Sequence, residues 1–325
     1  MRGVIHESFG DPAKVLKLGE RSVPEPASGQ VRIRTIMSPI HNHDLWTVRG
    51  QYGYKPELPA VGGSEAVGIV DALGADVTNV KVGQRVSVAA VHGTWAEFFL
   101  APAALLVPVP DSIDDSAAAQ IIAMPLSALM LIHFLDVKSG AWIIQNAANG
   151  AVGKMVAVLA EAMGINVINL VRRDEGVDEL AQVGVGKAIS TASPDWKEKV
   201  QTLCASDPIS AAIDSVGGEA SGELLSLLGE GGALISFGSM SGEPMQLSSG
   251  DLIFKQAIVK GFWGSKVGAA LSATDKAGMI SEIFQAVQNG SLKLTVDQTY
   301  AFGEAAQAAA ASLRSGRGGK IMLRP

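Results

Sequence analysis

The segment from Ala141 to Arg173 restricts the fold more than any other part of this 325-residue chain. It reads AWIIQNAANGAVGKMVAVLAEAMGINVINLVRR, which contains an apolar strand, a turn of small residues, a helix and a second apolar strand. One apolar helix face is formed by residues at i, i+3, i+4, i+7 and i+11, namely Val152, Met155, Val156, Leu159 and Met163. Gly164 suits the end of this helix. The order strand, helix, strand predicts a parallel βαβ unit.

The alternation of buried strands and amphipathic helices continues to about residue 262. The later apolar strand segments are SAAIDSV (210–216), ALISFG (233–238) and AIVKGF (257–262). The 37 glycines suit a chain with many tight turns between strands and helices. We therefore predict an α/β fold with a doubly wound parallel sheet in a domain of residues 118–264.

The first third of the chain has a different pattern. Short alternating segments are separated by Gly and Pro, and they read VRIRTIM, EAVGIVDAL, QRVSVAAV and AEFFLAPAALLVPV. This spacing predicts a mostly-β domain of residues 1–117. Asp114, Asp115 and Ser116 can cap a helix that starts close to the domain boundary. Residues 265–325 contain no further βαβ unit, so we expect them to complete the first domain.

Composition restricts the class of partner. The chain has 26 Lys and Arg residues against 32 Asp and Glu, and the basic residues are scattered. Nothing in this distribution predicts a nucleic-acid surface, so a small-molecule substrate is favoured. The single cysteine, Cys204, excludes an intrachain disulfide and any zinc site built from several thiolates.

One apolar run, AAAQIIAMPLSALMLIHFL (117–135), is long enough to span a bilayer. It is interrupted by Gln120, Pro125, Ser127 and His133 and lacks basic flanks, so we interpret it as two buried helices broken at Pro125. No membrane association is expected. The N-terminal sequence shows no targeting segment, and a cytoplasmic location is expected.

Small residues at Ala147, Gly150 and Gly153 follow the first strand of the βαβ unit. Such a turn lets backbone N–H groups approach a pyrophosphate and lets the helix pack closely on the sheet. The spacing therefore predicts a dinucleotide site. The alternative is a turn that serves packing alone.

The second strand of the unit ends in Val171-Arg172-Arg173, where an NAD-binding sheet presents an acidic residue to the ribose. Guanidinium groups pair with a 2′-phosphate, whereas a carboxylate repels it. NADPH is therefore the predicted cofactor. The alternative for the two arginines is an exposed pair at a helix start beside Asp174 and Glu175.

The β domain, the nucleotide fold with Ala-x-x-Gly-x-x-Gly and the short tail together resemble the medium-chain dehydrogenase/reductase superfamily over the whole chain. The resemblance implies a Rossmann domain and a GroES-like catalytic domain. Zinc-dependent members carry Cys-x-x-Asp and Gly-His-Glu, and this chain has His41-Asn42-His43-Asp44 and Gly63-Ser64-Glu65 in their places. It also lacks a four-cysteine lobe. Histidines two apart on a strand point to opposite faces, so we predict no metal site.

Within the superfamily the chain is most similar to the trans-2-enoyl thioester reductases of mitochondrial fatty-acid synthesis. The matching strings are GDPAKV, RGQYGYKPELPAVGGSE, GTWAEF, WIIQNAANGAVG, INLVRR, SVGGEAS, LIFK and KGFW. The resemblance implies that Tyr52, in Gly50-Gln51-Tyr52-Gly53, is the proton donor. The cofactor contacts that it implies are Asn149, Gly150, Ala151, Val152, Gly153, Arg172, Arg173, Phe237, Gly238, Ser239, Met240, Phe262, Trp263, Gly264 and Lys320.

Two positions depart from that family. Met124 stands where an Asn before Pro is usual, and Gly150-Ala151 replaces Ser-Gly in the glycine turn. The first change removes a polar contact near the nicotinamide or the substrate carbonyl. It therefore affects the expected substrate more than the expected fold.

The expected reaction is NADPH-dependent reduction of an α,β-unsaturated carbonyl, with a trans-2-enoyl thioester as substrate. Hydride addition to the β carbon creates an enolate that needs a proton, which the phenol of Tyr52 can supply. The alternative role for Tyr52 and Tyr54 is to pack over a loop. Alternative functions are a quinone or enone reductase, and a cofactor-binding protein without catalysis. The resemblance also implies a homodimer.

Overall fold

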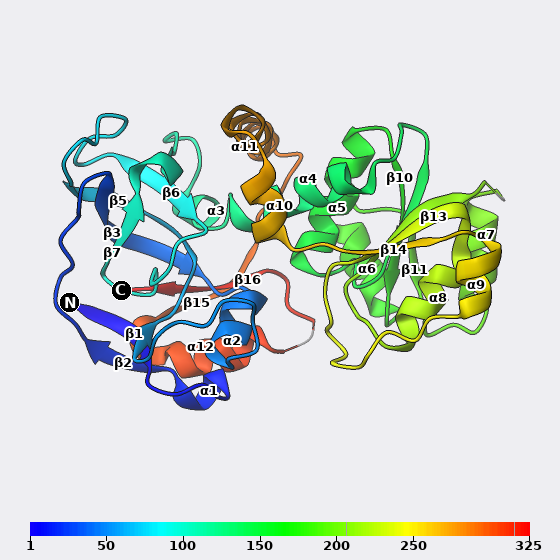
Figure 1. Ribbon diagram of the computed structural model, residues 1–325, viewed down its shortest axis with the longest axis horizontal. Coiled ribbons are helices and arrows are strands. Elements are labelled where there is room, and N and C mark those ends of the chain that lie inside the picture. Colours follow the sequence, from blue (N-terminus) through cyan, green and yellow to red (C-terminus); the bar gives the residue numbers. More distant parts are fainter. Residues whose placement is uncertain (206, 315) are drawn as a thin grey trace. The chain divides into compact units, whose positions relative to one another are not determined.

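The structure is a computed structural model that describes residues 1–205, 207–314 and 316–325. The chain forms two compact units (Figure 1). Unit 1 comprises Met1–Ala123 and Ile283–Pro325, and unit 2 comprises Met124–Glu282. Each unit has its own buried cores, and each is described separately below.

Unit 2 is built on a parallel six-stranded sheet, counted over the described residues. Its strands are β9 (Trp142–Gln145), β10 (Asn166–Val171), β11 (Ala188–Ser190), β12 (Ile209–Asp214), β13 (Leu228–Ser236) and β14 (Ile258–Gly261). The spatial order is β11-β10-β9-β12-β13-β14, which is 3-2-1-4-5-6 within the unit. This is the strand order of a Rossmann fold, and it confirms the predicted fold class.

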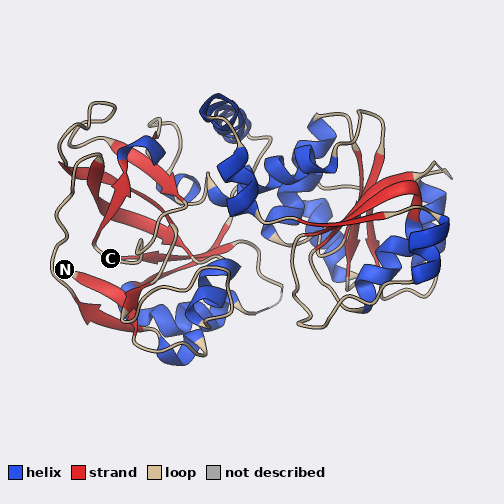
Figure 2. Cartoon of the chain, viewed as in Figure 1, coloured by secondary structure: helices blue, strands red, loops and turns tan. Residues whose placement is uncertain are grey.

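Helices cover both faces of this sheet (Figure 2). Within and at the ends of this unit the helices are α4 (Ala123–Leu135), α5 (Ala151–Ala162), α6 (Glu175–Gln182), α7 (Trp196–Leu203), α8 (Glu219–Leu227), α9 (Ser249–Phe254), α10 (Gly264–Ala270) and α11 (Ala273–Gln288). Of these, α5, α6, α7 and α8 share buried cores with the strands. One core packs α7 and α8 on the strands through Trp196, Leu224 and Leu225. A second core packs α5 and α6 through Ala157 and Leu180. Two covered faces explain why the strands read as continuous apolar runs.

Unit 1 contains two sheets. The three-stranded sheet has the order β2-β1-β4, from β1 (Arg2–His6), β2 (Lys17–Glu20) and β4 (Ala60–Val61). The larger sheet has the order β15-β16-β3-β5-β6-β8, with β7 also paired to β3. Its strands are β3 (Gln30–Pro39), β5 (Glu65–Leu73), β6 (Arg85–Ala89), β7 (Phe98–Pro102), β8 (Val107–Pro108), β15 (Val296–Ala301) and β16 (Lys320–Arg324). The C-terminal strands β15 and β16 thus complete this sheet.

The helical elements of unit 1 are short. They are α1 (Pro12–Val15), α2 (Asn42–Val48), η1 (Ala103–Leu105), α3 (Asp115–Ala118), η2 (Phe302–Glu304) and α12 (Ala305–Ser312). The predicted cap is confirmed at α3, because Asp114 Oδ1 accepts a hydrogen bond of 2.9 Å from the N–H of Ala117.

The predicted break at Pro125 is wrong. Chain 119–122 separates α3 from α4, and Pro125 lies in the first turn of α4, where its missing N–H interrupts no helical hydrogen bond.

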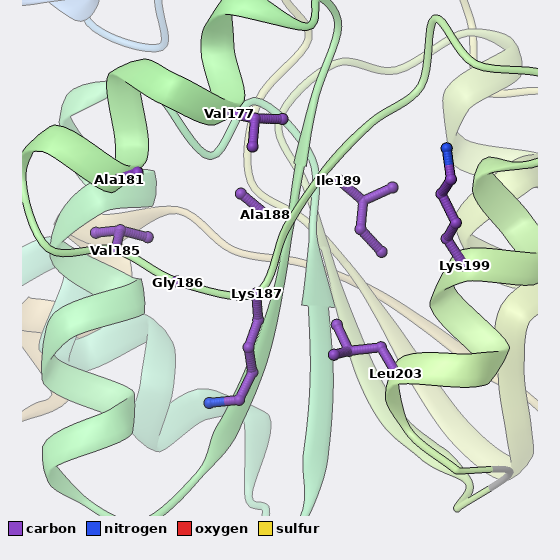
Figure 3. A pocket seen from close by; sticks show the side chains of 9 residues that line it. All are labelled: Val177, Ala181, Val185, Gly186, Lys187, Ala188, Ile189, Lys199 and Leu203. Atoms are coloured by element: carbon purple, nitrogen blue, oxygen red, sulfur yellow. The ribbon is translucent and has the colours of Figure 1, made fainter.

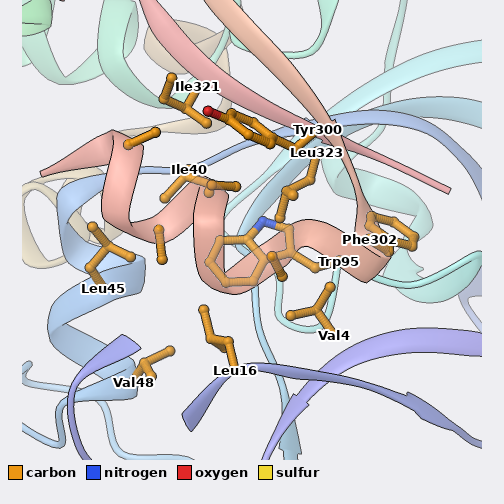
Figure 4. Close-up of a cluster of buried hydrophobic side chains, with 14 residues drawn as sticks. Val4, Leu16, Ile40, Leu45, Val48, Trp95, Tyr300, Phe302, Ile321 and Leu323 are labelled. Carbon is orange, nitrogen blue, oxygen red and sulfur yellow. The ribbon is translucent and has the colours of Figure 1, made fainter. Parts of the chain in front are cut away.

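Trp95 is the centre of the core that positions the Gly62-Gly63-Ser64-Glu65 segment of unit 1 (Figure 4). Its side chain is fully buried, and its indole N–H donates to the carbonyl of Pro39 at 3.1 Å. A Cβ added at Gly62 would come within 2.3 Å of the indole ring, so only glycine lets the chain pass so close. The packing of Gly62 on Trp95 therefore fixes the chain that leads to Ser64 and Glu65.

Candidate active site

The glycine turn of unit 2 leads from β9 into α5. A Cβ at Gly153 would lie 2.7 Å from the carbonyl oxygen of Ala148, so this glycine brings the helix close to the strand end. Gly150 is the N-cap and, in the described chain, provides no side-chain hydrogen bond to the first turn. The first N–H groups of α5, at Ala151 and Val152, are therefore oriented to receive an anion. This geometry fits a pyrophosphate.

The end of β10 holds the two arginines in different surroundings. Arg172 is exposed and has neither a hydrogen bond nor an ion pair within the described part of the chain. Arg173 pairs with Glu179 at 3.4 Å and with Glu175 at 3.8 Å. Glu179 also accepts a hydrogen bond of 3.1 Å from the side-chain amide of Asn149, which ties the glycine turn to α6. Arg172 thus has the unpaired guanidinium that a phosphate needs, while Arg173 is already partly neutralised.

A buried polar cluster joins the ends of β9 and β12, where the strand order reverses. Asn146 donates to Asp214 Oδ1 at 2.7 Å and accepts from the N–H of Ser215 at 2.7 Å. Asp214 also accepts from the N–H of Val216 and from the hydroxyl of Ser221. Ligands of open α/β sheets bind at such a reversal point. The only sign of this cluster in the sequence is Asp214-Ser-Val-Gly-Gly after a buried strand, because the contact of Asn146 with Asp214 joins residues 68 positions apart.

The remaining predicted cofactor residues of unit 2 follow β13 and β14. The N–H groups of Phe237 and Gly238 donate to the carbonyl of Asp214 at 2.8 and 3.1 Å, which places this segment beside the polar cluster. The rings of Phe237 and Phe262 lie 5.7 Å apart between centroids. Met240 and Trp263 are 66% and 47% exposed, so both side chains are accessible to a ligand. The structure therefore brings all four predicted segments of unit 2 to the carboxyl ends of its strands.

A groove of about 390 Å³ lies in unit 2 at the sheet edge formed by β11, along α6, β11 and α7 (Figure 3). Its lining is mainly apolar, with two lysines. Lys187 is paired with Glu161 at 2.7 Å and Lys199 with Asp195 at 2.9 Å. Neither lysine is available for an anion, so this groove has no feature of a phosphate site.

In unit 1 the expectation for His41 and His43 is wrong. Both lie at the start of helix α2, with His41 as its N-cap, and not on a strand. Their rings stack at 5.1 Å instead of pointing to opposite faces. The helix starts here because Asp44, its third residue, accepts a hydrogen bond of 2.9 Å from the N–H of His41. This is the backward half of a capping box.

Glu65, the first residue of β5, is fully buried and highly connected. Its Oε2 lies 2.7 Å from Nε2 of His41, and its Oε1 accepts from the N–H groups of Ile122 and Ala123, both at 2.8 Å. Burial raises the pKa of Glu65 to about 7, and burial lowers the pKa of His41 well below its ordinary value. His41 is therefore neutral at pH 7, and its Nε2 shares a hydrogen bond with Oε2 of Glu65.

Ser64 stands where the zinc-dependent members have a histidine, and it links two side chains of α2. Its hydroxyl donates to Asp44 Oδ1 at 2.6 Å, and Nε2 of His43 lies 2.7 Å from the same hydroxyl. The ring of His43 also contacts Tyr52, with 5.7 Å between ring centroids. The structure thus places the predicted proton donor beside a hydrogen-bonded chain of Asp44, Ser64 and His43.

Lys320, at the start of β16, is the predicted cofactor residue that belongs to unit 1. Burial lowers its pKa to about 8, although the nearby carboxylates of Asp44 and Glu65 act in the opposite direction. Across the described chain its amino group makes no hydrogen bond or ion pair. It is therefore available to a ligand as a donor and as a positive charge.

Two searches restricted to the described residues give negative results. No group of three or more His, Cys, Asp or Glu side chains has an arrangement suited to a metal ion. No helix combines the length and the apolar character needed to cross a membrane.

Comparisons with known proteins agree with this architecture. Residues 27–111 match the alcohol dehydrogenase GroES-like domain, and residues 151–283 match the zinc-binding dehydrogenase family. The chain belongs to the medium-chain dehydrogenase/reductase superfamily, whose members are NAD(P)H-dependent oxidoreductases. This confirms the resemblance noted in the sequence.

Three relatives illustrate the range of the family. The mitochondrial enoyl-[acyl-carrier-protein] reductase of Xenopus tropicalis is 33% identical over 303 residues, which cover 90% of this chain and 86% of that protein. A Bacillus thuringiensis protein described as an NADPH:quinone reductase is 28% identical, with a TM-score of 0.91 over 100% of this chain and 98% of that one. A mycobacterial protein solved with NADPH is 26% identical, with a TM-score of 0.89 over 100% of both chains.

Proposed function

We propose that this protein is an NADPH-dependent reductase that transfers hydride to the β carbon of a trans-2-enoyl thioester. The observation that carries the proposal is the 33% identity over 90% of the chain to an enoyl-[acyl-carrier-protein] reductase. In functional terms, residues 1–117 with 265–325 form the catalytic domain and residues 118–264 form the cofactor domain. A long identity to one activity is stronger support than a shared fold, because one fold serves many chemistries.

The cofactor residues have separate proposed roles. The N-terminus of α5, from Asn149 to Gly153, receives the pyrophosphate, and Arg172 pairs with the 2′-phosphate. The segments Phe237–Met240 and Phe262–Gly264 contact the nicotinamide, and Lys320 donates to the bound cofactor. When bound, NADPH supplies the hydride.

Tyr52 has the chemical role in this proposal. Addition of hydride to the β carbon leaves an enolate, and the phenol of Tyr52 donates the proton that completes the saturated thioester. The position of Tyr52 against the ring of His43 supports this role, since the loop then presents a phenol next to a polar chain that can exchange protons.

A steady-state comparison of acceptors tests the proposal. We expect crotonyl-CoA to be reduced with a kcat/KM well above that for a naphthoquinone, and NADPH to be preferred over NADH. Tyr52→Phe should lower kcat with crotonyl-CoA by about 10²-fold while NADPH affinity is retained, because only the proton is removed. Tyr54→Phe is the matched control and should retain activity. An unchanged kcat in Tyr52→Phe would contradict the assigned role.

A quinone or enone reductase is the second candidate. It is supported by the structural similarity to the Bacillus thuringiensis protein, which is 28% identical. Faster turnover of naphthoquinone than of crotonyl-CoA in the same comparison would favour this candidate. NADPH binding without oxidation by any acceptor would instead favour a protein that binds the cofactor without catalysis.

We also propose a homodimer in which unit 2 contributes the edge strand β14. All four residues of β14 are exposed, and β14 is an end strand of its sheet in the described chain. Helix α9, which precedes β14 in the chain, exposes Ile253 and Phe254, which are 66% and 85% accessible. An unpaired apolar edge of this kind readily pairs with a second copy.

A further inference from the structure

The proposed reaction leaves Tyr52 without its proton after each turnover, so a proton must be returned to it. The nearest polar chain in unit 1 consists of Asp44, Ser64 and His43. Ser64 Oγ donates to Asp44 at 2.6 Å, and Nε2 of His43 lies 2.7 Å from the same oxygen. The ring of His43 contacts the ring of Tyr52. No step of the reaction described so far uses His43.

The hydrogen bonds determine which nitrogen of His43 carries the fixed proton. The Ser64 hydroxyl has one proton, which it gives to Asp44, and an ionised carboxylate only accepts. Nε2 of His43 must therefore be the N–H that donates to Ser64 Oγ. The other nitrogen, Nδ1, has no hydrogen bond in the described chain and is the one that can gain and lose a proton.

We propose that His43 is a positioning residue that returns the proton to Tyr52, held in orientation by Ser64 and Asp44; this inference rests on the proposed function. The Nδ1–H of the imidazolium gives its proton to the phenolate oxygen of Tyr52, directly or through one water. The neutral ring then takes a proton from solvent, to which its side chain is 27% exposed. The buried carboxylate of Asp44 fixes the Ser64 hydroxyl to which His43 is hydrogen-bonded.

Other charged or titratable groups surround His43. Asp44 Oδ1 lies 3.5 Å from Nε2 of His43. His41 is buried and neutral and stacks on the ring, so it adds no charge. Glu65 and His92 both interact electrostatically with His43, and Lys320 lies close to Asp44 and Glu65.

The test uses the full chain with NADPH and crotonyl-CoA. His43→Gln keeps an N–H for Ser64 but has no proton to transfer, so kcat should fall by about 10²-fold with KM nearly unchanged. The decline of kcat with rising pH that a histidinium donor produces should disappear. In His43→Ala, added imidazole should restore part of kcat, which a purely structural role would not allow.

A double variant separates the relay from general damage. In the Tyr52→Phe background, His43→Gln should lower kcat no further, because the relay then has no recipient. His133→Ala, which removes an exposed histidine of α4, is the control and should keep wild-type kcat and gain nothing from imidazole. Thermal melting and NADPH affinity show whether each variant is folded.

The outcomes distinguish the relay from the proposed function. Wild-type protein that does not reduce crotonyl-CoA overturns the proposed function and the relay together. A wild-type protein that is active, with an unchanged kcat and pH profile in His43→Gln, overturns the relay alone. Additive losses in the double variant, or an imidazole effect equal to that in His133→Ala, would also reject it.

Discussion

Arg172 and Arg173 are adjacent in the chain but differ in what surrounds them. Arg173 is held by Glu175 and Glu179, as the alternative interpretation of an exposed helix-start pair expects, whereas Arg172 has no such partner in the described chain. The sequence alone does not separate them, because Glu179 lies on the next turn of α6 and its contact with Asn149 depends on the fold. Specificity for the 2′-phosphate is therefore assigned mainly to Arg172.

This difference predicts unequal effects of two substitutions. Arg172→Ala should weaken NADPH binding by about 1.5–3 kcal/mol, the contribution of a hydrogen bond to a charged group, with little effect on NADH. Arg173→Ala should have a smaller effect on NADPH. Fluorescence titration of both variants with both cofactors measures these values. Equal losses for NADPH and NADH in Arg172→Ala would contradict a contact with the 2′-phosphate.

Glu65 and His41 form a buried pair whose two members respond to pH in opposite directions. The pKa of Glu65 is raised by burial from 4.5 to about 7, so its contribution to stability is present below pH 4.5 and is lost as the pH rises through about 7. The pKa of His41 is lowered, so its contribution is present above pH 6.5 and is lost as the pH falls. In the wild type these two opposite effects of pH on the unfolding free energy partly cancel.

Glu65→Gln should reveal the pH dependence of the unfolding free energy that His41 contributes. The glutamine can still accept from the N–H groups of Ile122 and Ala123, but it no longer titrates. We expect the free energy of unfolding of the variant to rise more steeply with pH than that of the wild type between about pH 4.5 and pH 7, the range that the two shifted pKa values define. Urea unfolding at several pH values tests this, with exposed Glu57→Gln as control. Parallel curves for wild type and Glu65→Gln would refute the assignment.

Among the elements, α5 was predicted closely and α2 was missed. The apolar period and Gly164 are local signals, and they mark α5 and its end in the chain itself. Helix α2 has no common N-cap residue, because His41 occupies that position and Asp44 provides the cap from inside the helix. The contact of Glu65 with His41 joins residues 24 positions apart and has no local signal. The strand prediction for residues 41–43 is therefore wrong because tertiary contacts determine the conformation of this segment.

Substitution of Gly153 should destabilise the start of α5. Gly153→Ala places a Cβ against backbone atoms of Ala147 and Ala148, which cannot rotate away, so the unfolding free energy should fall by about 1–3 kcal/mol. NADPH affinity should fall with it, because the helix end moves. Gly278→Ala in α11 meets no atom within 4 Å and should instead stabilise by about 0.5–1 kcal/mol. Thermal and urea unfolding compare the two. A stable Gly153→Ala variant with normal NADPH affinity would show that the close approach is not required.

For the whole molecule, the topology of unit 2 can be predicted from the sequence more completely than that of unit 1. The Rossmann topology follows from repeated strand and helix patterns, since a parallel sheet with right-handed crossovers leaves few alternatives. In unit 1 the sheets could be expected, but their order could not, because β16 pairs with β3 across almost the whole chain. The site of unit 1 therefore became visible only in three dimensions.

The exposed edge of unit 2 leads to a prediction about assembly. Ile258→Glu with Phe254→Glu places two charges on β14 and α9, which should prevent pairing between copies and yield monomers. Analytical ultracentrifugation of the wild type and the double variant measures the mass. Val82→Glu changes an exposed apolar residue of unit 1 and is the matched control. A monomeric wild type, or an unchanged mass in the variant, would contradict the proposed interface.

Isotope labelling tests whether hydride passes from NADPH to the β carbon of the enoyl thioester. NADPH carrying deuterium at the transferable position of the nicotinamide is incubated with crotonyl-CoA, and the product is examined by mass spectrometry and NMR. The proposed reaction predicts butyryl-CoA with one deuterium on the β carbon and a solvent-derived proton on the α carbon. Label at any other position, or no saturated product, would contradict it.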